Sequence, residues 1–239
     1  KRTKAVIYTQ MNGRNGKIDE ISKICKKKNI FLIEDAAHAI GSYIKNKHAG
    51  NHGIASSFSF SMPKLITMGQ GGSVITNNSK LAKKLRLFKN FGRKIDGVDI
   101  HNYLGYNFKI TDLQSVLALG QLKNINYRIK EKRKIYKLYF NLLKDNKKIK
   151  IFSPNKNETN WSVDIYLNKS LDLHKKLKSN KIISRFVYPP INSQKIYKNQ
   201  KGLPVSNKFC KNGLWLPTSI DLKEREIKKI CTIINDYIK

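Results

Sequence analysis

Acidic residues are scarce in this chain: 16 Asp and Glu stand against 48 Lys and Arg, which gives a formal net charge of +32 over 239 residues. No stretch approaches the roughly 18 consecutive apolar residues that a membrane-spanning helix needs, so we expect no membrane partner. The three cysteines lie far apart and lack the spacing of metal ligands, which favours a reduced, cytoplasmic protein without a metal site. Hydrophobic residues make up 40% of the chain, enough to exclude a largely disordered protein.

The positive charge is carried mainly by lysine, with 40 lysines and eight arginines scattered along almost the whole chain. A strongly basic protein often binds nucleic acid or an anionic membrane. This sequence, however, has no arginine-rich block, no zinc-finger spacing and no aromatic-basic RNA motif, and its lysine cluster at 26–28 falls where a helix is expected to end. The charge therefore predicts a lysine-rich solvated surface and disfavours a nucleic acid partner.

The first half of the chain alternates strand-like and helix-like segments. Short apolar runs predict strands, and apolar residues that recur at helical spacing predict helices. Strand–helix–strand units of this kind favour a parallel α/β sheet with right-handed crossovers. The expected strands are 5–8, 31–33, 56–60 and 73–76, and the expected helices are 18–29 and 81–88.

The second half of the chain has a different order of expected helices and strands. From Thr111, whose hydroxyl can cap a helix, apolar residues recur every three or four positions as far as Leu143 and predict one long helix. Asp221 and Glu224 have the spacing of a capping box at the start of a final amphipathic helix. Between these helices we expect strands at 161–167 and 182–188 and a helix at 171–178.

A first chemical cluster, Glu34-Asp35-Ala36-Ala37-His38, follows an apolar strand. Ligands of open α/β sheets gather at the carboxyl ends of strands. A carboxylate there can pair with a cationic nitrogen of a ligand, and a nearby histidine can hydrogen-bond an oxygen. An aspartate in this position can equally cap a helix, so the cluster alone leaves both roles open.

A second cluster places Lys64 after the apolar and hydroxyl-rich segment 57–63. Desolvation lowers the pKa of a lysine amine and makes it a nucleophile that can form Schiff bases. Among 40 lysines, an ordinary exposed loop lysine is the better interpretation on spacing alone. The glycines at 69–72 permit tight turns and close backbone approach, but they match no phosphate-binding or dinucleotide-binding motif.

In order along the chain, these clusters form a specific set that covers nearly its whole length. The set consists of Asp35-Ala36-Ala37-His38, Gly50-x-x-Gly53, Phe58-Ser59-Phe60-x-x-x-Lys64, Gly69-Gln70-Gly71-Gly72, the segment from Gly105 to Gln114, Ser184-Arg185 with Tyr188-Pro189-Pro190, and Leu214-Trp215-Leu216-Pro217. It resembles the DegT/DnrJ/EryC1/StrS family of pyridoxal-phosphate (PLP) sugar aminotransferases. The resemblance implies an α/β fold, the PLP-dependent transferase fold type I (aspartate-aminotransferase-like). Residues 1–125 would be the C-terminal portion of a partial PLP-binding large domain, and residues 126–239 a small α+β domain with the interdomain helix.

The resemblance carries roles over to five positions. Lys64 falls on the lysine that binds PLP as a Schiff base, and Asp35 falls on the carboxylate that pairs with the pyridinium nitrogen. His38 matches the His or Gln beside the cofactor, near its phenolic oxygen. Ser59 matches a hydroxyl that binds the cofactor phosphate, and Asn107 matches an Asn that reaches the phosphate of the neighbouring subunit's cofactor, which implies a homodimer with composite sites.

The implied reaction is a transamination. An amino-acid donor, usually glutamate in this family, supplies the amine, which passes to a keto group of a nucleotide-linked sugar, typically a 4-keto-6-deoxyhexose. A sugar-dehydratase branch of the family has His at the lysine position, so Lys64 favours the aminotransferase. Arg185 matches a family arginine to which the sequence assigns no role.

Two features depart from the family pattern. Ile54 stands where the family usually has Asp after Gly53, and the resemblance opens at Thr3, without the first third of a typical member. That third normally holds a phosphate loop, an aromatic residue that stacks on PLP and much of the sugar pocket. The alternative hypothesis is therefore a truncated, inactive family member that acts as a basic binding protein, for which binding to nucleic acid should fall steeply with salt.

Overall fold

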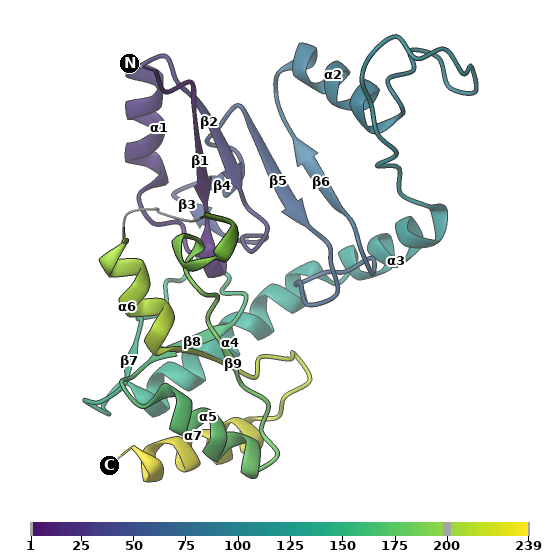
Figure 1. The fold of residues 1–239 in the computed structure, drawn as a ribbon. Coiled ribbons are helices and arrows are strands. Elements are labelled where there is room, and N and C mark those ends of the chain that lie inside the picture. Colours follow the sequence, from purple (N-terminus) through teal and green to yellow (C-terminus); the bar gives the residue numbers. More distant parts are fainter. Residues whose placement is uncertain (1, 198–201, 239) are drawn as a thin grey trace. The chain divides into compact units, whose positions relative to one another are not determined.

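The computed structural model describes residues 2–197 and 202–238 and divides into two compact units. One unit holds Lys1–Ile129 and Asn157–Thr159, and the other holds Lys130–Lys156 and Asn160–Lys239. Each unit contains its own sheet. Figure 1 shows the elements of both.

The sheet of the first unit has the strand order β1-β2-β5-β6. Strands β1 (Ala5–Thr9), β2 (Phe31–Asp35) and β5 (Ala55–Ser59) are parallel, and β6 (Gly72–Ile75) runs antiparallel to β5. Because β1, β2 and β5 are parallel, their carboxyl ends meet at one edge of the sheet, where Asp35 pairs with Ser57 in register. The four strands of the first half lie where the sequence predicts them.

Helix α1 (Ile18–Lys27) covers one face of this sheet (Figure 1). Its residues Ile18 and Cys25 are buried against Leu32 of β2. Because side chains alternate along a strand, Ile7 and Phe31 point to the opposite face, where they are 70% and 59% exposed. Parallel sheets normally have both faces covered, so the described part of this unit leaves one apolar sheet face open.

The prediction of one long helix from Thr111 to Leu143 is wrong in one respect. The structure has two helices, α3 (Asp112–Leu122) and α4 (Ile125–Leu143). Asn124 lies between them and donates its N–H to the carbonyl of Gln121, three residues back rather than four. Asparagine favours such turns because it has a low helix propensity. The start is as predicted, since Thr111 caps α3 and exchanges hydrogen bonds with Gln114.

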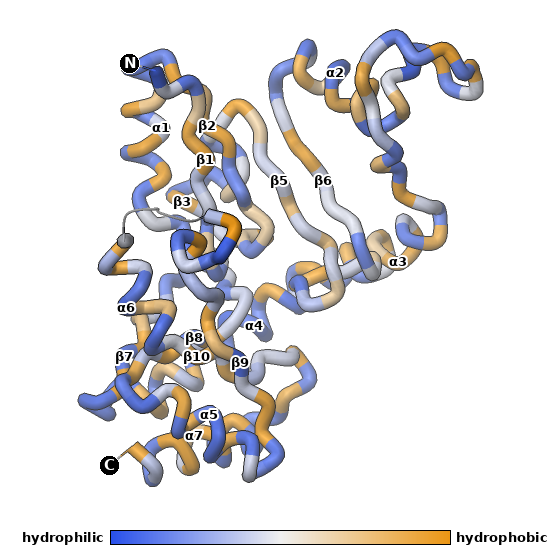
Figure 2. Tube along the Cα trace, viewed as in Figure 1, coloured by the Kyte–Doolittle hydropathy of each residue, from blue (hydrophilic) through white to orange (hydrophobic). Residues whose placement is uncertain are grey.

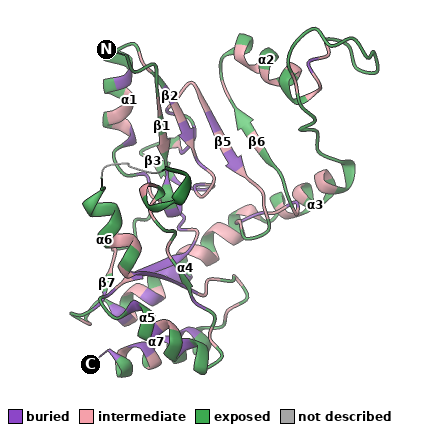
Figure 3. Cartoon of the chain, viewed as in Figure 1, coloured by how far each residue is buried: buried purple, intermediate pink, exposed green. Residues whose placement is uncertain are grey.

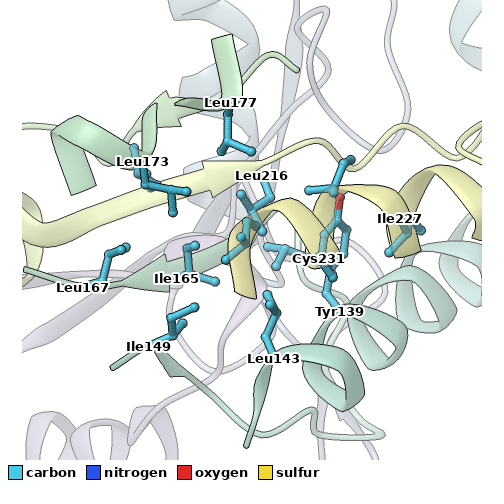
Figure 4. Packing of buried hydrophobic residues seen from close by; sticks show 14 of the residues in the cluster. Tyr139, Leu143, Ile149, Ile165, Leu167, Leu173, Leu177, Leu216, Ile227 and Cys231 are labelled. Atoms are coloured by element: carbon cyan, nitrogen blue, oxygen red, sulfur yellow. The ribbon is translucent and has the colours of Figure 1, made fainter. Parts of the chain in front are cut away.

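The second unit is built on an antiparallel sheet with the order β7-β8-β10-β9. Residues of α4, α5 and α7 pack with this sheet around one apolar core, in which Tyr139, Leu173 and Leu177 are fully buried (Figure 4). The elements are β7 (Lys150–Ile151), β8 (Val163–Tyr166), α5 (Ser170–Ser179), β9 (Arg185–Phe186), α6 (Pro204–Asn212), β10 (Gly213–Leu216) and α7 (Glu224–Tyr237).

The predicted capping box at Asp221 is wrong. The last helix begins at Glu224, and the carboxylate of Glu226 accepts a hydrogen bond from the N–H of Lys223 at 2.8 Å. Asp221 instead accepts a hydrogen bond from Ser219 in the preceding turn. The amphipathic pattern itself is confirmed, because Ile227 and the isoleucines that follow it at helical spacing pack into the core.

In the part of the chain that the structure describes, the remaining elements are one helix, one hairpin and three 3-10 helices. They are helix α2 (Ser79–Lys89), the hairpin of β3 (Tyr43–Ile44) and β4 (Lys47–His48), and the 3-10 helices Met11–Gly13, Ile191–Ser193 and Lys195–Tyr197. All three cysteines are free thiols. Within the described ranges, no helix has both the length and the apolarity to cross a membrane, and no cluster of His, Cys, Asp or Glu could hold a metal ion.

Candidate functional site

The carboxyl edge of the parallel sheet brings three of the predicted residues into one electrostatic cluster. Asp35 is the last residue of β2, His38 lies three residues beyond it, and Lys64 lies in the loop that joins β5 to β6. Lys64 and Asp35 both act on the pKa of His38, and Asp35 acts on that of Lys64. These three side chains therefore lie near enough to influence one another's charge.

Burial and these neighbours set the charge of His38. Its pKa falls from 6.5 to about 4, first because the ring is desolvated and second because the Lys64 ammonium repels a further positive charge, while Asp35 acts in the opposite direction. At neutral pH the imidazole is therefore uncharged. Its Nδ1 accepts a hydrogen bond from the backbone N–H of Asn12 at 3.2 Å. A neutral ring with Nδ1 as acceptor carries its proton on Nε2, which makes Nε2–H a donor.

Lys64 is a half-buried amine and not one of the many exposed lysines. Desolvation lowers its pKa, and the charge of Asp35 raises it. The partial loss of solvent makes the free amine more accessible near neutral pH than it is for a surface lysine. Sequence alone could not separate Lys64 from the other 39 lysines in this way.

The loop that carries Lys64 is held at both ends and from the side. Its ends pair through Phe60 and Gly71, and the N–H of Lys64 donates to the carbonyl of Ser61 at 3.0 Å. The N–H of Thr67 donates to the Gln121 side chain on α3 at 3.0 Å. These contacts fix the backbone of the loop that carries Lys64 at the sheet edge.

Ser59 ends β5 and begins this same loop. Its hydroxyl lies 3.1 Å from the hydroxyl of Ser61 and accepts the Ser61 N–H at 3.4 Å. Two hydroxyls thus lie together at the carboxyl end of a strand, where hydrogen-bond donors for an anionic group are useful. The sequence predicted Ser59 and missed Ser61.

Asn107 does not belong to this cluster. It lies exposed in the segment between α2 and α3 and forms an isolated bridge with Asn90. Arg185 lies in the other unit, where its guanidinium stacks 5.1 Å from the ring centre of Tyr188 and 5.7 Å from that of Trp215. The backbone N–H of Ile54 donates to the carbonyl of Leu32, and nothing in the structure explains its side chain.

The sequence placed Glu34 in the first chemical cluster but missed its role, which is that of a buried carboxylate that shapes the site. Glu34, with no exposed surface, accepts hydrogen bonds from the side chain of Gln10 and from the backbone N–H groups of Gly50, His52 and Gly53, at 2.5–3.0 Å. A buried charge is stable only when it is paired or well hydrogen-bonded. The available signal was an acidic residue inside an apolar strand, one position before Asp35.

A second missed feature is a segment from far along the chain. Thr159 donates its N–H to Ser42 at 2.9 Å and its hydroxyl to the carbonyl of Gly41 at 2.9 Å. Gly13, with φ +74°, approaches it so closely that a Cβ there would lie 2.1 Å from the Thr159 carbonyl oxygen and 2.9 Å from that of His38. No local pattern could reveal a contact between residues more than 100 positions apart.

The fold defines a class of protein. The chain superposes on Helicobacter pylori PseC, an aminotransferase involved in the biosynthesis of pseudoaminic acid. The TM-score is 0.93 and the identity 27%, over 99% of this chain and 67% of that one. This architecture is fold type I of the PLP-dependent transferases, as the sequence predicted.

Sequence comparison gives the family. The profile of the DegT/DnrJ/EryC1/StrS aminotransferase family matches residues 1–235, and the chain belongs to that family. It is 30% identical to GDP-perosamine synthase of Vibrio cholerae over 99% of this chain and 67% of that protein. It is 29% identical to UDP-4-amino-4,6-dideoxy-N-acetyl-beta-L-altrosamine transaminase of Helicobacter pylori, over 96% of this chain and 64% of that protein.

The chain thus spans about two thirds of the length of these curated relatives. The predicted family is confirmed, and PLP dependence is a general property of that family. The comparisons do not favour the alternative of an inactive basic binding protein.

Proposed function

We propose that this protein is a PLP-dependent aminotransferase that moves an amino group from an amino-acid donor, glutamate, to a keto group of a nucleotide-linked 4-keto-6-deoxy sugar. The observation that carries the proposal is the cluster of Lys64, Asp35 and His38 at the carboxyl edge of the sheet. The names of the relatives support the sugar class, since they describe GDP-perosamine synthase and a UDP-amino-sugar transaminase.

The side chains present fit the cofactor. Asp35 offers an anion for a pyridinium nitrogen, His38 a neutral N–H donor for a phenolic oxygen, Ser59 a hydroxyl for a phosphate and Lys64 an amine for the aldehyde. Asn107, which lies away from these four, would serve the neighbouring subunit's cofactor. When bound, PLP supplies an aldehyde that reacts with amines and a ring that accepts electrons from the carbon beside the amine.

Lys64 moves the proton in this reaction. Its lowered pKa increases the fraction of free amine, so Nζ can accept a proton from a carbon atom of the bound amino donor and return it elsewhere. The charge of Asp35 raises the pKa of Lys64 and so limits the effect of desolvation. The hydrogen bond from Thr67 to Gln121 anchors the loop that carries Lys64.

Asp35 and His38 would bind and orient the cofactor. The Asp35 carboxylate accepts the N–H of Ala37 at 3.2 Å, which fixes its orientation at the end of β2. The neutral His38 donates from Nε2 without adding a positive charge that would compete with Lys64 for Asp35. The hydrogen bond from Asn12 holds the ring in that tautomer.

The proposal includes a homodimer. Helix α3 has no buried residue and exposes Leu113, Val116, Leu117 and Leu119, with Leu113 74% exposed (Figures 2 and 3). Covering these exposed apolar side chains with a partner would stabilise the assembly.

The three free thiols support a reducing, cytoplasmic compartment.

Borohydride trapping tests the cofactor site. The purified chain is incubated with PLP, reduced with sodium borohydride and mapped by mass spectrometry. We expect the adduct on the Lys64 peptide, lost in Lys64→Ala and retained in Lys80→Ala, which removes an exposed lysine of α2.

The same test is run on the chain joined to the N-terminal third of Vibrio cholerae GDP-perosamine synthase. Labelling scattered over many lysines in both proteins, or adducts unchanged by Lys64→Ala, would overturn the assignment. Labelling of Lys64 in the joined protein alone would show that the chain holds the chemistry and needs the longer partner sequence to bind the cofactor.

A further inference from the structure

The second unit contains a cavity of about 650 Å³ that the proposed aminotransfer does not use. It lies among the turn before β7, the strands β7 and β8, helix α6 and the end of α7, all within that unit. Its volume falls in the range of small-molecule sites, roughly 300–1,000 Å³. It is too small a feature to be a nucleic-acid groove.

The cavity has a rim of one charge. Five lysines line it and none of the described lining residues is acidic; the lysines are Lys147, Lys148, Lys150, Lys169 and Lys208. They come from four separate places in the chain, so the cluster is made by the fold and not by one run of basic residues. Lysines gathered around one cavity create a positive potential there, which attracts anions. Five of them suit an anion with several charges, and lysine binds phosphate well as a point charge.

The floor and wall of the cavity are apolar. Ile149 and Leu167 are buried beneath it, and the rings of Tyr166 and Phe209 pack edge to face with their centres 4.9 Å apart. The ammonium of Lys150 lies 4.9 Å from the ring centre of Phe209. A ligand here can therefore place a planar apolar part against aromatic rings and its charged part among lysines.

We propose that this cavity binds a nucleoside polyphosphate, with its phosphates on the lysine rim and its base against the aromatic wall. The lysines of the rim would bind the phosphates. The aromatic wall would bind a planar group, which a nucleotide has and inorganic phosphate lacks. The binding is independent of the proposed aminotransferase activity, because the four residues proposed to hold the cofactor in the chain's own site belong to the other unit.

The test is calorimetric titration with ADP, pyrophosphate and adenosine in 150 mM NaCl. We expect one ADP per chain, tighter than pyrophosphate, and adenosine at least tenfold weaker. Lys169→Gln/Lys208→Gln should weaken ADP about tenfold, the loss of one or two charge-assisted hydrogen bonds. The matched control Lys175→Gln/Lys176→Gln removes the same charge from the exposed side of α5 and should leave the Kd within twofold.

Two further variants separate the parts of the proposal. Phe209→Leu should weaken ADP more than pyrophosphate, and Lys64→Ala should leave ADP binding within twofold. Equal weakening by both lysine pairs, pyrophosphate as tight as ADP, or many ADP per chain with steep salt dependence would each overturn the proposal. A preference for single-stranded nucleic acid over ADP that both lysine pairs reduce alike would overturn it too.

Discussion

His38 owes its charge state to its surroundings. An isolated histidine is half-protonated near pH 6.5, whereas this one has its pKa lowered to about 4 by burial and by Lys64. The Asn12 N–H then selects the tautomer. One residue thus acquires a fixed role as a neutral donor from its burial and from two neighbours, at positions 12 and 64.

This predicts a pH-dependent stability. Between pH 6.5 and 4 the unfolded chain takes up a proton at residue 38 and the folded chain does not, so stability is full above pH 6.5 and is lost as the pH falls. Urea unfolding at pH 7 and pH 5 should show that the cofactor-free chain loses about 1–2 kcal/mol more than His38→Gln does. Parallel pH curves for the two proteins would contradict the assignment.

At the scale of elements, Glu34 joins three pieces of chain. Its carboxylate holds β2, the end of β1 through Gln10 and the loop from Gly50 to Gly53. The loop needs glycine at position 53, because a Cβ there would lie 2.4 Å from the Leu32 carbonyl oxygen. Glu34 therefore holds the loop beside the carboxyl edge of the sheet, where Asp35 lies.

Glu34→Gln should destabilise the chain by about 2–4 kcal/mol, because an amide group replaces an acceptor oxygen that faces N–H donors in a buried place. Hydrogen exchange should show the amides of Gly50, His52 and Gly53 opening faster. The control Glu224→Gln changes an exposed carboxylate of α7 that pairs with Lys228, and it should destabilise the chain far less than Glu34→Gln does. Unchanged protection of the three amides in Glu34→Gln would refute the role of Glu34 in holding the loop from Gly50 to Gly53.

On the scale of the whole molecule, the described part of the first unit leaves large apolar side chains exposed on its sheet and on α3. The open sheet face shows Ile7 and Phe31, and α3 exposes leucines along its length. Contiguous apolar surface of this kind marks interaction sites. About a third of the length of the Vibrio cholerae relative lies outside its match to this chain. The proposed homodimer would cover α3.

Light scattering of the chain should report a dimer, and Leu113→Lys/Leu117→Lys should give a monomer because two charges replace the exposed leucines of α3. Leu171→Lys/Ile183→Lys adds the same charge at exposed apolar positions of the other unit and should stay dimeric. A monomeric parent chain, or dissociation by both variants alike, would count against the α3 interface.

Much of the fold could be read from the sequence where the pattern is local. The strands around Val6, Leu32 and Phe58 and the helix that begins at Thr111 follow from hydrophobic runs and a capping hydroxyl. The break at Asn124 and the later start of α7 could not be predicted, because a single turn depends on which acceptor each backbone N–H bonds to. The roles of Lys64, Asp35, His38, Ser59 and Asn107 came from resemblance and stay predictions.

The sequence by itself determined the family, the α/β order of the first half and the candidate cofactor residues, because those depend on motifs in a fixed order. Tertiary structure alone decided which charges meet. It lowered the pKa of His38, buried Glu34 beneath its loop and brought Thr159 against Gly13. It also gathered five scattered lysines around one cavity. Desolvation and long-range contact depend on distances in space, which the order of residues does not contain.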